Sequence, residues 1–473
     1  MDEKLNQPIS LAGTPAASPL GYYSWVFAHL ARDPVYILII IYIFLPYLSN
    51  TVIGDPVRGQ ASIGYVQSFS AWLVALTIPF LGAIADKDGR RKPWVLGTVL
   101  VMAIASIGLW WVTPQQESQG ALLGLALLFM IYTAFPISEV FHNAMLPAIV
   151  PANKGGLISG LGFSSGNMSG LLLMLFVLFA FAMPGAQTWY FLPEKPWFGI
   201  DQSLFEHDRL VGPLCGIWML IFTLPVLFFT PDGETSNRSW KESAREGVKD
   251  LIATIRQVKH YANIARYLLA RMLYNDGMAA VLTFGGIYAS GVFGWGSIDL
   301  LILGLLTSFS AMVGAYLGGL LDDWLGSLRT LRLVTILNAV ALISLVSVTS
   351  DTILYVVPVS TEPVWDFPYF STVSELYYLA NNQFFALVFV TNLGASRTLM
   401  ARISPPEMTS QFFALFGLSS TVTLFVGPLL VAVITDITGS TRLGVGSLAI
   451  LIIAGSLVLL SVKDERSQRA SAI

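Results

Sequence analysis

The segment FLGAIADKDGRR, residues 80–91, is echoed by YLGGLLDDWLG, residues 316–326. Superposing the two segments places Asp86 on Asp322. Two further pairs recur at comparable offsets: GFSS from Gly162 with GLSS from Gly417, and LARDPV from Leu30 with LYNDGM from Leu273. Similar segments that recur at a nearly constant offset indicate an internal repeat. We therefore predict that the chain consists of two related halves.

The composition places both halves in a membrane. Of the 473 residues, 55% are hydrophobic and only 12% are charged, and the mean hydropathy is +0.68. A soluble domain carries about 25% charged residues. The net charge of -3 gives no electrostatic support for binding nucleic acid. Since a bilayer crossing takes about 20 apolar residues, the hydrophobic content is sufficient for roughly a dozen crossings.

Apolar runs bounded by turns or charges predict the membrane spans and their orientation. An even number of spans puts both termini on one side of the membrane. The predicted outer loops hold only four of the 26 basic residues, so the excess of Lys and Arg on the other side predicts cytosolic termini. The twelve predicted spans are residues 25–49, 62–84, 94–113, 120–141, 156–183, 211–230, 263–294, 297–321, 329–349, 375–396, 410–434 and 441–462.

Cysteine and histidine usage predicts neither a metal site nor a cofactor. The single cysteine, Cys215, excludes a disulfide within the chain, and the four histidines are too scattered for a metal-ligand spacing. The acidic N-terminal segment lacks the features of a signal peptide. The predicted organisation is a disordered cytosolic tail (1–22), an N-terminal six-helix bundle (23–230), a cytosolic linker (231–262), a C-terminal six-helix bundle (263–462) and a second cytosolic tail (463–473).

The linker and two outer loops stand out by composition. In the linker, apolar residues such as Trp240 and Leu251 recur at helical spacing opposite charged residues, which predicts an amphipathic helix at the membrane interface. This helix either packs on the cytosolic face or senses lipid. The loops at residues 184–210 and 350–374 are rich in aromatic residues and proline, and we expect them to form ordered caps on the outer face.

The run GAIADKDGRR, residues 82–91, resembles the loop signature of the major facilitator superfamily between its second and third helices. Other stretches resemble the branch that includes the autophagy-related vacuolar effluxers and their bacterial relatives. These stretches are LYNDG from Leu273, FHNAMLP from Phe141, ASRTLMA from Ala395 and the run from Phe412 to Pro428. The resemblance covers nearly the whole chain and implies an all-α membrane protein with twelve transmembrane helices in two pseudo-symmetric six-helix bundles, the major facilitator fold.

The first helix departs from that branch. Where the branch tends to show Tyr-Asp-Trp-Ala-Asn, this chain has Ala-His-Leu-Ala-Arg at residues 28–32, and we expect the acidic position to have moved to Asp33. The resemblance also implies a cytosolic gate, in which Asp86 accepts bonds from Arg90 or from a helix N-terminus of the other half. The alternative is that these charges only enforce topology. The predicted gate residues are Gly82, Asp86, Gly89, Arg90, Arg91 and Asp322.

Charged residues inside apolar spans mark the candidate site, because an Asp or Arg at mid-helix costs about 2.5 to 3.5 kcal/mol on insertion scales. At the helical rise per residue, Asp276 lies about 18 Å along the seventh helix and Asp33 about 12 Å along the first. Arg32 adjoins Asp33, and Arg271 shares a helix face with Asn275. Each Arg either holds an Asp in a permanent ion pair or releases it to carry a proton.

Polar residues on two further helices complete the candidate site. Glu139 and His142 share one face of the fourth helix. Three consecutive amides on the tenth helix cannot all face lipid, so they either bind substrate or hydrogen-bond a neighbouring helix. Glycines at four-residue spacing, such as Gly162 and Gly166, predict close helix packing. The predicted substrate or proton site consists of Arg32, Asp33, Glu139, Arg271, Asn275, Asp276, Asn381, Asn382 and Gln383.

These features predict a secondary active transporter of a small solute that works by alternating access and is coupled to protons. Asp33 and Asp276 are expected to face a shared midplane cavity. The resemblance implies an amino acid or similar metabolite as substrate. The alternative is an amphipathic or lipid-like substrate. An intramembrane enzyme is disfavoured because only Glu139 with His142 offers an acid-base pair, and no nucleophile lies beside it.

The expected partners follow from this function. They are a small-molecule substrate, a proton as coupling ion and the lipid bilayer, with no nucleic acid. The sequence contains no phosphate-binding loop, which excludes transport driven by ATP. We expect a functional monomer in a bacterial cytoplasmic membrane rather than a vacuolar one.

Overall fold

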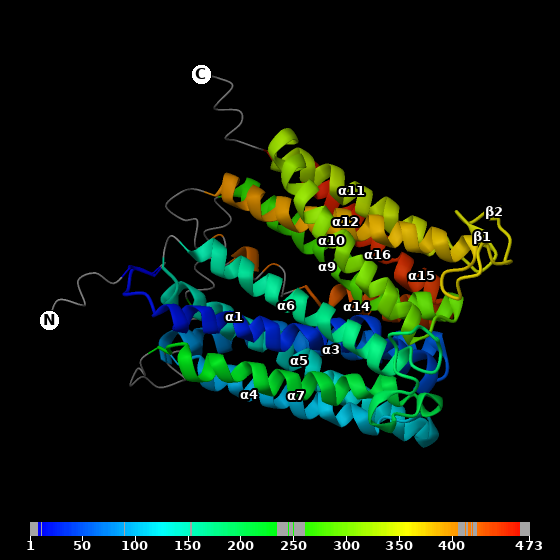
Figure 1. Cartoon of the computed structure of the whole chain (residues 1–473). Helices are drawn as coiled ribbons and strands as arrows, with labels where there is room; N and C mark the ends of the chain where they lie inside the picture. The colour runs from blue at the N-terminus through cyan, green and yellow to red at the C-terminus, as the bar shows by residue number, and fades with distance from the viewer. Residues whose placement is uncertain are drawn as a thin grey trace. The chain divides into compact units, whose positions relative to one another are not determined.

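The computed structural model describes residues 8–10, 12–88, 90–151, 154–233, 245, 249, 261–404, 412, 415–417, 419 and 423–463. These residues are almost entirely helical (Figure 1). The chain divides into two compact units: unit 1 comprises Met1–Leu48 and Leu76–Leu251, and unit 2 comprises Ser49–Ala75 and Ile252–Ile473.

The helices of the first half begin and end close to the predicted spans. The first span is a composite of α1 (Pro19–Pro34), the π-helical turns η2 (Val35–Tyr42) and η3 (Leu48–Val52), and the short α2 (Phe44–Tyr47) between them. The other long helices are α3 (Pro56–Asp88), α4 (Lys92–Gly108), α5 (Glu117–Ile149), α6 (Gly155–Val177) and α7 (Glu206–Phe229). Short extensions follow two of them, η4 (Leu109–Trp111) after α4 and η6 (Leu178–Ala182) after α6.

The second half repeats this series. Its long helices are α9 (Ala262–Phe293), α10 (Ser297–Leu325), α11 (Ser327–Val346), α12 (Val373–Ile403), α14 (Val426–Thr438) and α16 (Leu448–Leu460), with the short α15 (Thr441–Gly446) before α16. A two-stranded antiparallel hairpin, β1 (Thr352–Ile353) and β2 (Val357–Pro358), is the exception to the all-α prediction. It is confined to the loop between α11 and α12.

The same neighbour relations recur in the two halves. In unit 1, α1 packs against α6 and α7, and α4 packs against α5 and α7. In unit 2, α9 packs against α14 and α16, and α11 packs against α12 and α16. These relations match when α9, α11, α12, α14 and α16 are taken as the counterparts of α1, α4, α5, α6 and α7. Helix packing therefore agrees with the repeat read from the sequence.

Helix α3 contributes to both units, because its first half packs against α14 within unit 2. A Cβ on Gly64 would lie 2.9 Å from the carbonyl oxygen of Pro428, so the two backbones are in close contact. Gln60 Nε2 donates to Thr435 Oγ1 at 2.7 Å. Residues 49–75 thus belong to unit 2, whereas the predicted N-terminal bundle (23–230) includes them. An apolar run identifies a span but not the bundle against which each part of it packs.

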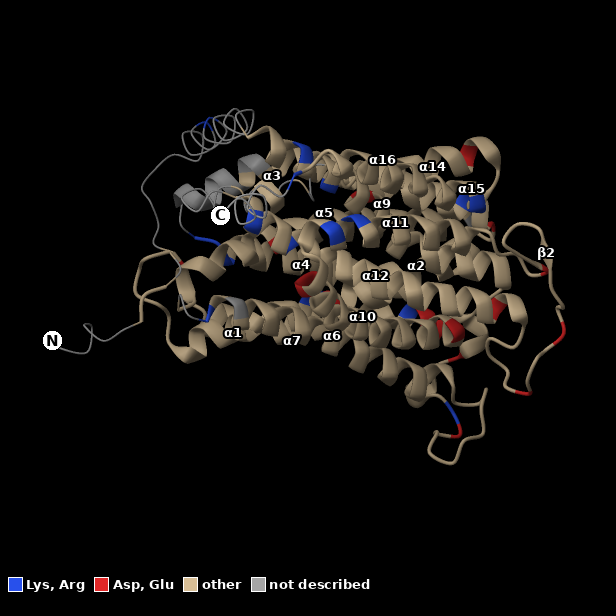
Figure 2. Ribbon diagram, turned by 90° about the horizontal axis from the view of Figure 1, so that it is seen from above, with Lys and Arg blue, Asp and Glu red and all other residues tan. Residues whose placement is uncertain are grey.

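The helices have the length and surface of membrane spans. Among the described residues, eleven helices are long and apolar enough to cross a membrane, and α14 is shorter. Much of the predicted span 410–434 falls on residues outside the described ones. Large apolar side chains stay exposed on the helices, including Leu122 (70%) and Ile104 (65%), as expected of surfaces that face lipid. Figure 2 shows how sparse charged residues are along the helices.

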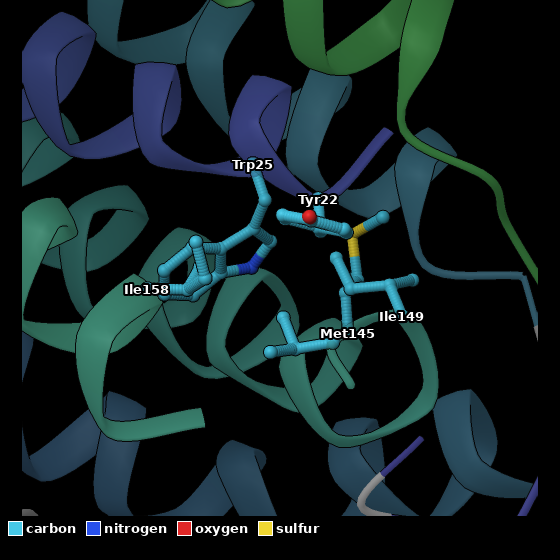
Figure 3. Close-up of a cluster of buried hydrophobic side chains, with 6 residues drawn as sticks. Tyr22, Trp25, Met145, Ile149 and Ile158 are labelled. Atoms are coloured by element: carbon cyan, nitrogen blue, oxygen red, sulfur yellow. The ribbon is translucent and has the colours of Figure 1, made fainter. Parts of the chain in front are cut away.

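A buried apolar cluster joins α1, α5 and α6 within unit 1 (Figure 3). Tyr22 and Trp25 of α1 pack against Met145 and Ile149 of α5 and Ile158 of α6. Each of these side chains is at most 3% exposed. A fully buried large apolar side chain contributes about 1.5 to 3 kcal/mol to the stability of the fold. The cluster therefore fixes the part of α1 that directly precedes His29, Arg32 and Asp33.

The two predicted outer caps are ordered. In the first, Gln202 Nε2 donates to the carbonyl oxygens of Phe181, Ala182 and Pro184 at 2.7 to 2.9 Å. In the second, the hairpin precedes Thr372, whose side chain caps α12 together with Glu375. The amphipathic linker helix predicted within residues 231–262 lies outside the described residues, apart from isolated positions.

Candidate functional site

The first helix of unit 1 carries a largely buried group of ionisable residues around Asp33. Asp33 Oδ1 lies 3.7 Å from Arg32 Nη2, and Asp33 Oδ2 lies 3.4 Å from His29 Nδ1. The Asp33 side chain is 19% exposed, whereas those of Arg32 and His29 are 3% exposed. The structure therefore brings Arg32 and Asp33 together as predicted and adds His29, one helical turn before Asp33.

Arg32 lies between α1 and α5 with an incomplete set of hydrogen bonds. Its guanidinium stands over the Phe135 ring, 5.0 Å from the ring centroid. Its Nε and Nη1 are buried and have no hydrogen-bond partner among the described residues. A buried polar group without a partner costs about 1 to 3 kcal/mol, and more when it is charged. Native proteins rarely leave such a group without a partner. A bound oxyanion is a suitable partner for the Arg32 guanidinium.

The His142 ring of α5 is held by contacts with Trp25 of α1. Its Nε2 is 2.9 Å from the carbonyl oxygen of Trp25, and Trp25 Nε1 donates to the carbonyl oxygen of His142 at 2.8 Å. The two rings stack with their centroids 4.2 Å apart. Glu139 lies on the same α5 face and is partly buried, while Asn143 is exposed. Glu139, the α5 residue of the predicted site, therefore remains a candidate.

Glycines on α6 make room for the α1 charges. A Cβ on Gly162 would lie 2.7 Å from His29 Cδ2, and a Cβ on Gly170 would lie 2.2 Å from Ile37 Cδ1. At Gly166 the nearest atom would be Asp33 Oδ2, at 1.9 Å. The predicted small-residue stripe is thus the surface against which the His29 and Asp33 side chains pack.

We expect Gly166→Ala to impair transport, because the new methyl group must displace the Asp33 carboxylate. Gly160→Ala is the matched control on the same helix, since a Cβ there meets no atom within 4 Å. The control should retain wild-type flux, and its stability should be unchanged or higher because Ala favours helix by about 1 kcal/mol over Gly. Flux and thermal unfolding of both variants test this expectation. Wild-type flux in Gly166→Ala would show that the position of Asp33 is unimportant.

Asp276 is the corresponding buried acid of unit 2, on α9. Its side chain is 3% exposed, and Oδ2 accepts a hydrogen bond from the backbone N–H of Gly427, the second residue of α14, at 3.0 Å. Oδ1 is buried without a hydrogen-bond partner among the described residues. A Cβ on Gly427 would lie 3.0 Å from the Asp276 carbonyl oxygen, so glycine permits this close approach.

Arg271 faces a different part of unit 2 from Asp276. Its Nη1 donates to the Phe416 carbonyl oxygen and to Ser419 Oγ, both at 2.8 Å, and its guanidinium stacks 3.6 Å from the Phe416 ring centroid. These contacts tie α9 to the segment that precedes α14. The two Arg–Asp pairs suggested by the sequence therefore differ: Arg32 adjoins Asp33, whereas Arg271 has other partners. Asn275 is partly buried on the same helix.

The amides of α12 bond mainly to neighbouring helices. Asn382 Nδ2 donates to Thr307 Oγ1 at 2.9 Å, and Gln383 Oε1 accepts from Ser310 Oγ at 2.9 Å, both on α10. These bonds favour the interhelical alternative for Asn382 and Gln383. Asn381 keeps a buried Nδ2 without a partner among the described residues and stays a candidate ligand.

Sequence reasoning missed two features of the site. His29 was noted only as one of four scattered histidines, although its four-residue spacing from Asp33 places both on one helix face. In unit 2, Tyr267 Oη donates to the Ser396 carbonyl oxygen, and Tyr274 Oη lies 2.8 Å from Ser396 Oγ. Both tyrosines are buried on α9, and nothing in their spacing identifies a partner on α12.

The predicted gate is described only in part. The Asp86 side chain and residue Gly89 lie outside the described residues, and the surroundings of Gly82 are not described either. Arg90 is exposed, and the backbone N–H of Arg91 donates to Asp232 Oδ1 at 2.8 Å. In the second copy, Asp322 Oδ2 accepts from Ser327 Oγ at 3.0 Å and lies 4.0 Å from Arg402 Nη2.

Membrane-spanning helices in two repeated halves, each with an acid within its apolar first helix, define the class as a multi-pass membrane transport protein. Comparison with solved structures agrees with this class at the level of the fold. The inward-open xylose transporter XylE from E. coli superposes with a TM-score of 0.59 at 13% identity, over 94% of this chain and 95% of that one. A POT family transporter in complex with 5-aminolevulinic acid gives a TM-score of 0.60 at 11% identity, over 96% and 97%.

Sequence comparison is more specific. The family model described as "Vacuole effluxer Atg22 like" matches residues 51–472. The uncharacterized MFS-type transporter YxiO of Bacillus subtilis is 24% identical over 459 residues, which cover 95% of this chain and 96% of that protein. Autophagy-related protein 22 of Cryptococcus neoformans is 28% identical over 280 residues, 58% of this chain and 49% of that protein, so the match spans about half of the fungal relative.

The chain therefore belongs to the vacuole effluxer Atg22-like family. It is a multi-pass membrane transporter of the MFS type, with the twelve-helix fold that the sequence predicted.

Proposed function

We propose that the chain is a secondary active transporter that moves an amino acid or similar small metabolite by alternating access and couples this movement to protons. Membership of an effluxer family supports the transport of a small solute. The observation that carries the proposal is an acid within the apolar first helix of each half: Asp33 on α1, which is partly exposed, and Asp276 on α9, which is buried. Ionisable residues are costly at membrane depth, and those that persist there mark substrate or ion pathways.

The residues around Asp33 suit a zwitterionic solute. Arg32 offers two buried guanidinium nitrogens, Nε and Nη1, that have no hydrogen-bond partner among the described residues, and the Asp33 carboxylate lies 3.7 Å from the same guanidinium. An α-amino acid presents a carboxylate next to an ammonium group, which complements this arrangement of charges. The amino acid assignment rests on this complementarity together with the family resemblance.

The surroundings of the Asp276 carboxyl group suit the role of a proton carrier. One of its oxygens accepts a backbone hydrogen bond, and the other is buried without a partner among the residues that the structure describes. No described Arg, Lys or His forms an ion pair with it. Binding a proton removes its charge without requiring a counter-ion, so the two protonation states can favour different conformations.

The remaining assignments follow the charge distribution and the relatives. We propose that both termini are cytosolic and that the chain works as a monomer in a bacterial cytoplasmic membrane. The Bacillus subtilis relative, which matches over 95% of this chain, supports a bacterial location over a vacuolar one.

Uptake and efflux in proteoliposomes test the proposal. The panel should include amino acids, their amides and small organic acids, each measured with and without an imposed pH gradient. We expect at least one zwitterionic solute to accumulate beyond equilibrium only when the gradient is present. Fluxes equal to those of protein-free liposomes across the panel would contradict the substrate assignment. Equal accumulation with and without the gradient would contradict proton coupling.

A further inference from the structure

A cavity of about 550 Å³ opens in unit 2. It lies where α10 ends, α11 begins, and α12 and α16 both end. Four basic residues line it: Arg329, Arg332, Arg402 and Lys463. No acidic residue is among the described residues that line it.

The four basic side chains differ in how well they are neutralised. Arg332 donates to the carbonyl oxygens of Leu460 and Val462 at 2.9 and 2.8 Å, which fixes it at the end of α16. Arg402 lies 4.0 Å from Asp322, and its side chain is 38% exposed. Arg329 and Lys463 are exposed, and their side chains make no hydrogen bond or ion pair with any described residue.

The position of Lys463 is nevertheless fixed through its backbone. Its N–H donates to Asn263 Oδ1 at 2.8 Å, and its carbonyl oxygen accepts from Asn263 Nδ2 at 2.6 Å. Arg329 lies in the first turn of α11, a turn that contains no acidic residue. Arg329 and Lys463, which have no side-chain partner among the described residues, are thus held beside Arg402, which is only weakly paired, and Arg332, which is bound to backbone carbonyls. Such a concentration of like charge is stabilised by a bound anion.

The cavity also has an apolar wall at the level of the membrane surface. Leu325 is the last residue of the α10 span, and Leu460 is the last residue of the α16 span. Both line the cavity together with Leu328. The predicted orientation puts this end of the bundle on the cytosolic side. Basic pockets between transmembrane helices on that side suit the headgroups of anionic lipids.

We propose that this cavity is a binding site for a phosphate group, carried by an anionic phospholipid. The phosphate accepts hydrogen bonds from Arg329, Arg402 and Lys463, and the leucines contact the glycerol and the start of the acyl chains. The proposal does not depend on the proposed transport function, although Arg402 also lies 4.0 Å from Asp322 of the predicted gate.

Thermal unfolding of the purified full-length chain in detergent tests the site. The probes are dioleoyl phosphatidylglycerol, dioleoyl phosphatidylcholine and inorganic phosphate, each titrated against the midpoint of unfolding. The double variant Arg329→Gln, Lys463→Gln removes two of the cations that line the cavity. Both side chains are exposed and have no partner in the described part of the chain, so the variant should fold. Arg266→Gln is the control, because Arg266 is an exposed cation on α9 outside the cavity.

We expect phosphatidylglycerol to raise the unfolding midpoint of the wild type and of Arg266→Gln, with phosphatidylcholine having little effect. In the double variant, the half-saturating phosphatidylglycerol concentration should rise by about 30-fold, given the usual gain per basic residue near an anionic lipid. If inorganic phosphate alone reproduces the stabilisation, the site binds phosphate but not specifically lipid. Equal stabilisation by the two lipids, or an unchanged titration in the double variant, would overturn the proposal.

Discussion

Asp276→Asn should abolish the accumulation of solute driven by a pH gradient while leaving solute exchange intact. The asparagine Oδ1 can still accept the hydrogen bond from the Gly427 N–H that Asp276 Oδ2 accepts at 3.0 Å. The contact between α9 and α14 is therefore retained. The substitution removes only the ability to bind and release a proton, which a gradient-driven cycle requires and an exchange cycle does not.

The measurement is accumulation and counterflow of the same solute in proteoliposomes. Asp323→Asn is the matched control, since Asp323 is an exposed acid at the end of α10 in the same unit. Accumulation should fall to the level of protein-free liposomes in Asp276→Asn and stay at the wild-type level in the control. If Asp276→Asn accumulates solute against a gradient as the wild type does, Asp276 does not carry the proton.

Arg32→Gln should abolish transport without destabilising the fold. Two of the guanidinium nitrogens of Arg32 are buried without partners among the described residues, so the wild-type fold already bears the cost of their desolvation. Replacing the charge by a neutral amide relieves part of that cost. Loss of a buried charge-assisted contact to the solute carboxylate costs about 2 to 5 kcal/mol, so solute affinity should fall at least about 30-fold.

Arg271→Gln provides the contrasting case. Arg271 Nη1 donates two hydrogen bonds at 2.8 Å, and the guanidinium stacks on Phe416. Its removal should lower the unfolding midpoint clearly. Thermal unfolding and solute binding of both variants separate the two roles. A lower midpoint for Arg32→Gln than for Arg271→Gln, with solute binding retained, would show that Arg32 serves the fold rather than the solute.

Most of the fold could be predicted from the sequence, because long apolar runs in this composition can only be membrane spans. The prediction of residues 263–294 matches α9 (Ala262–Phe293) to within a residue at each end. The association of residues 49–75 with unit 2 could not be predicted in this way, because it depends on contacts such as that of Gly64 with Pro428. An apolar run contains no information about its packing partner.

The candidate site was predicted in part, for a related physical reason. Helical spacing fixes which side chains share a face, and the spacing of Gly162 and Gly166 correctly predicted the close packing of α6. Spacing does not fix what lies opposite that face. Arg271 donates to Phe416 and Ser419, and the α12 amides bond to α10. These partners come from distant segments, so spacing within α9 or α12 cannot identify them.

The central claim is that solute and protons move together through this chain, and lumenal pH tests it most directly. Proteoliposomes containing the wild-type chain and a pH-sensitive dye should receive an inward gradient of the transported solute with no initial pH gradient. The account predicts that lumenal pH changes as the solute enters, acidifying for symport and becoming alkaline for antiport, and that Asp276→Asn abolishes the change. Solute entry at constant lumenal pH in the wild type would contradict it.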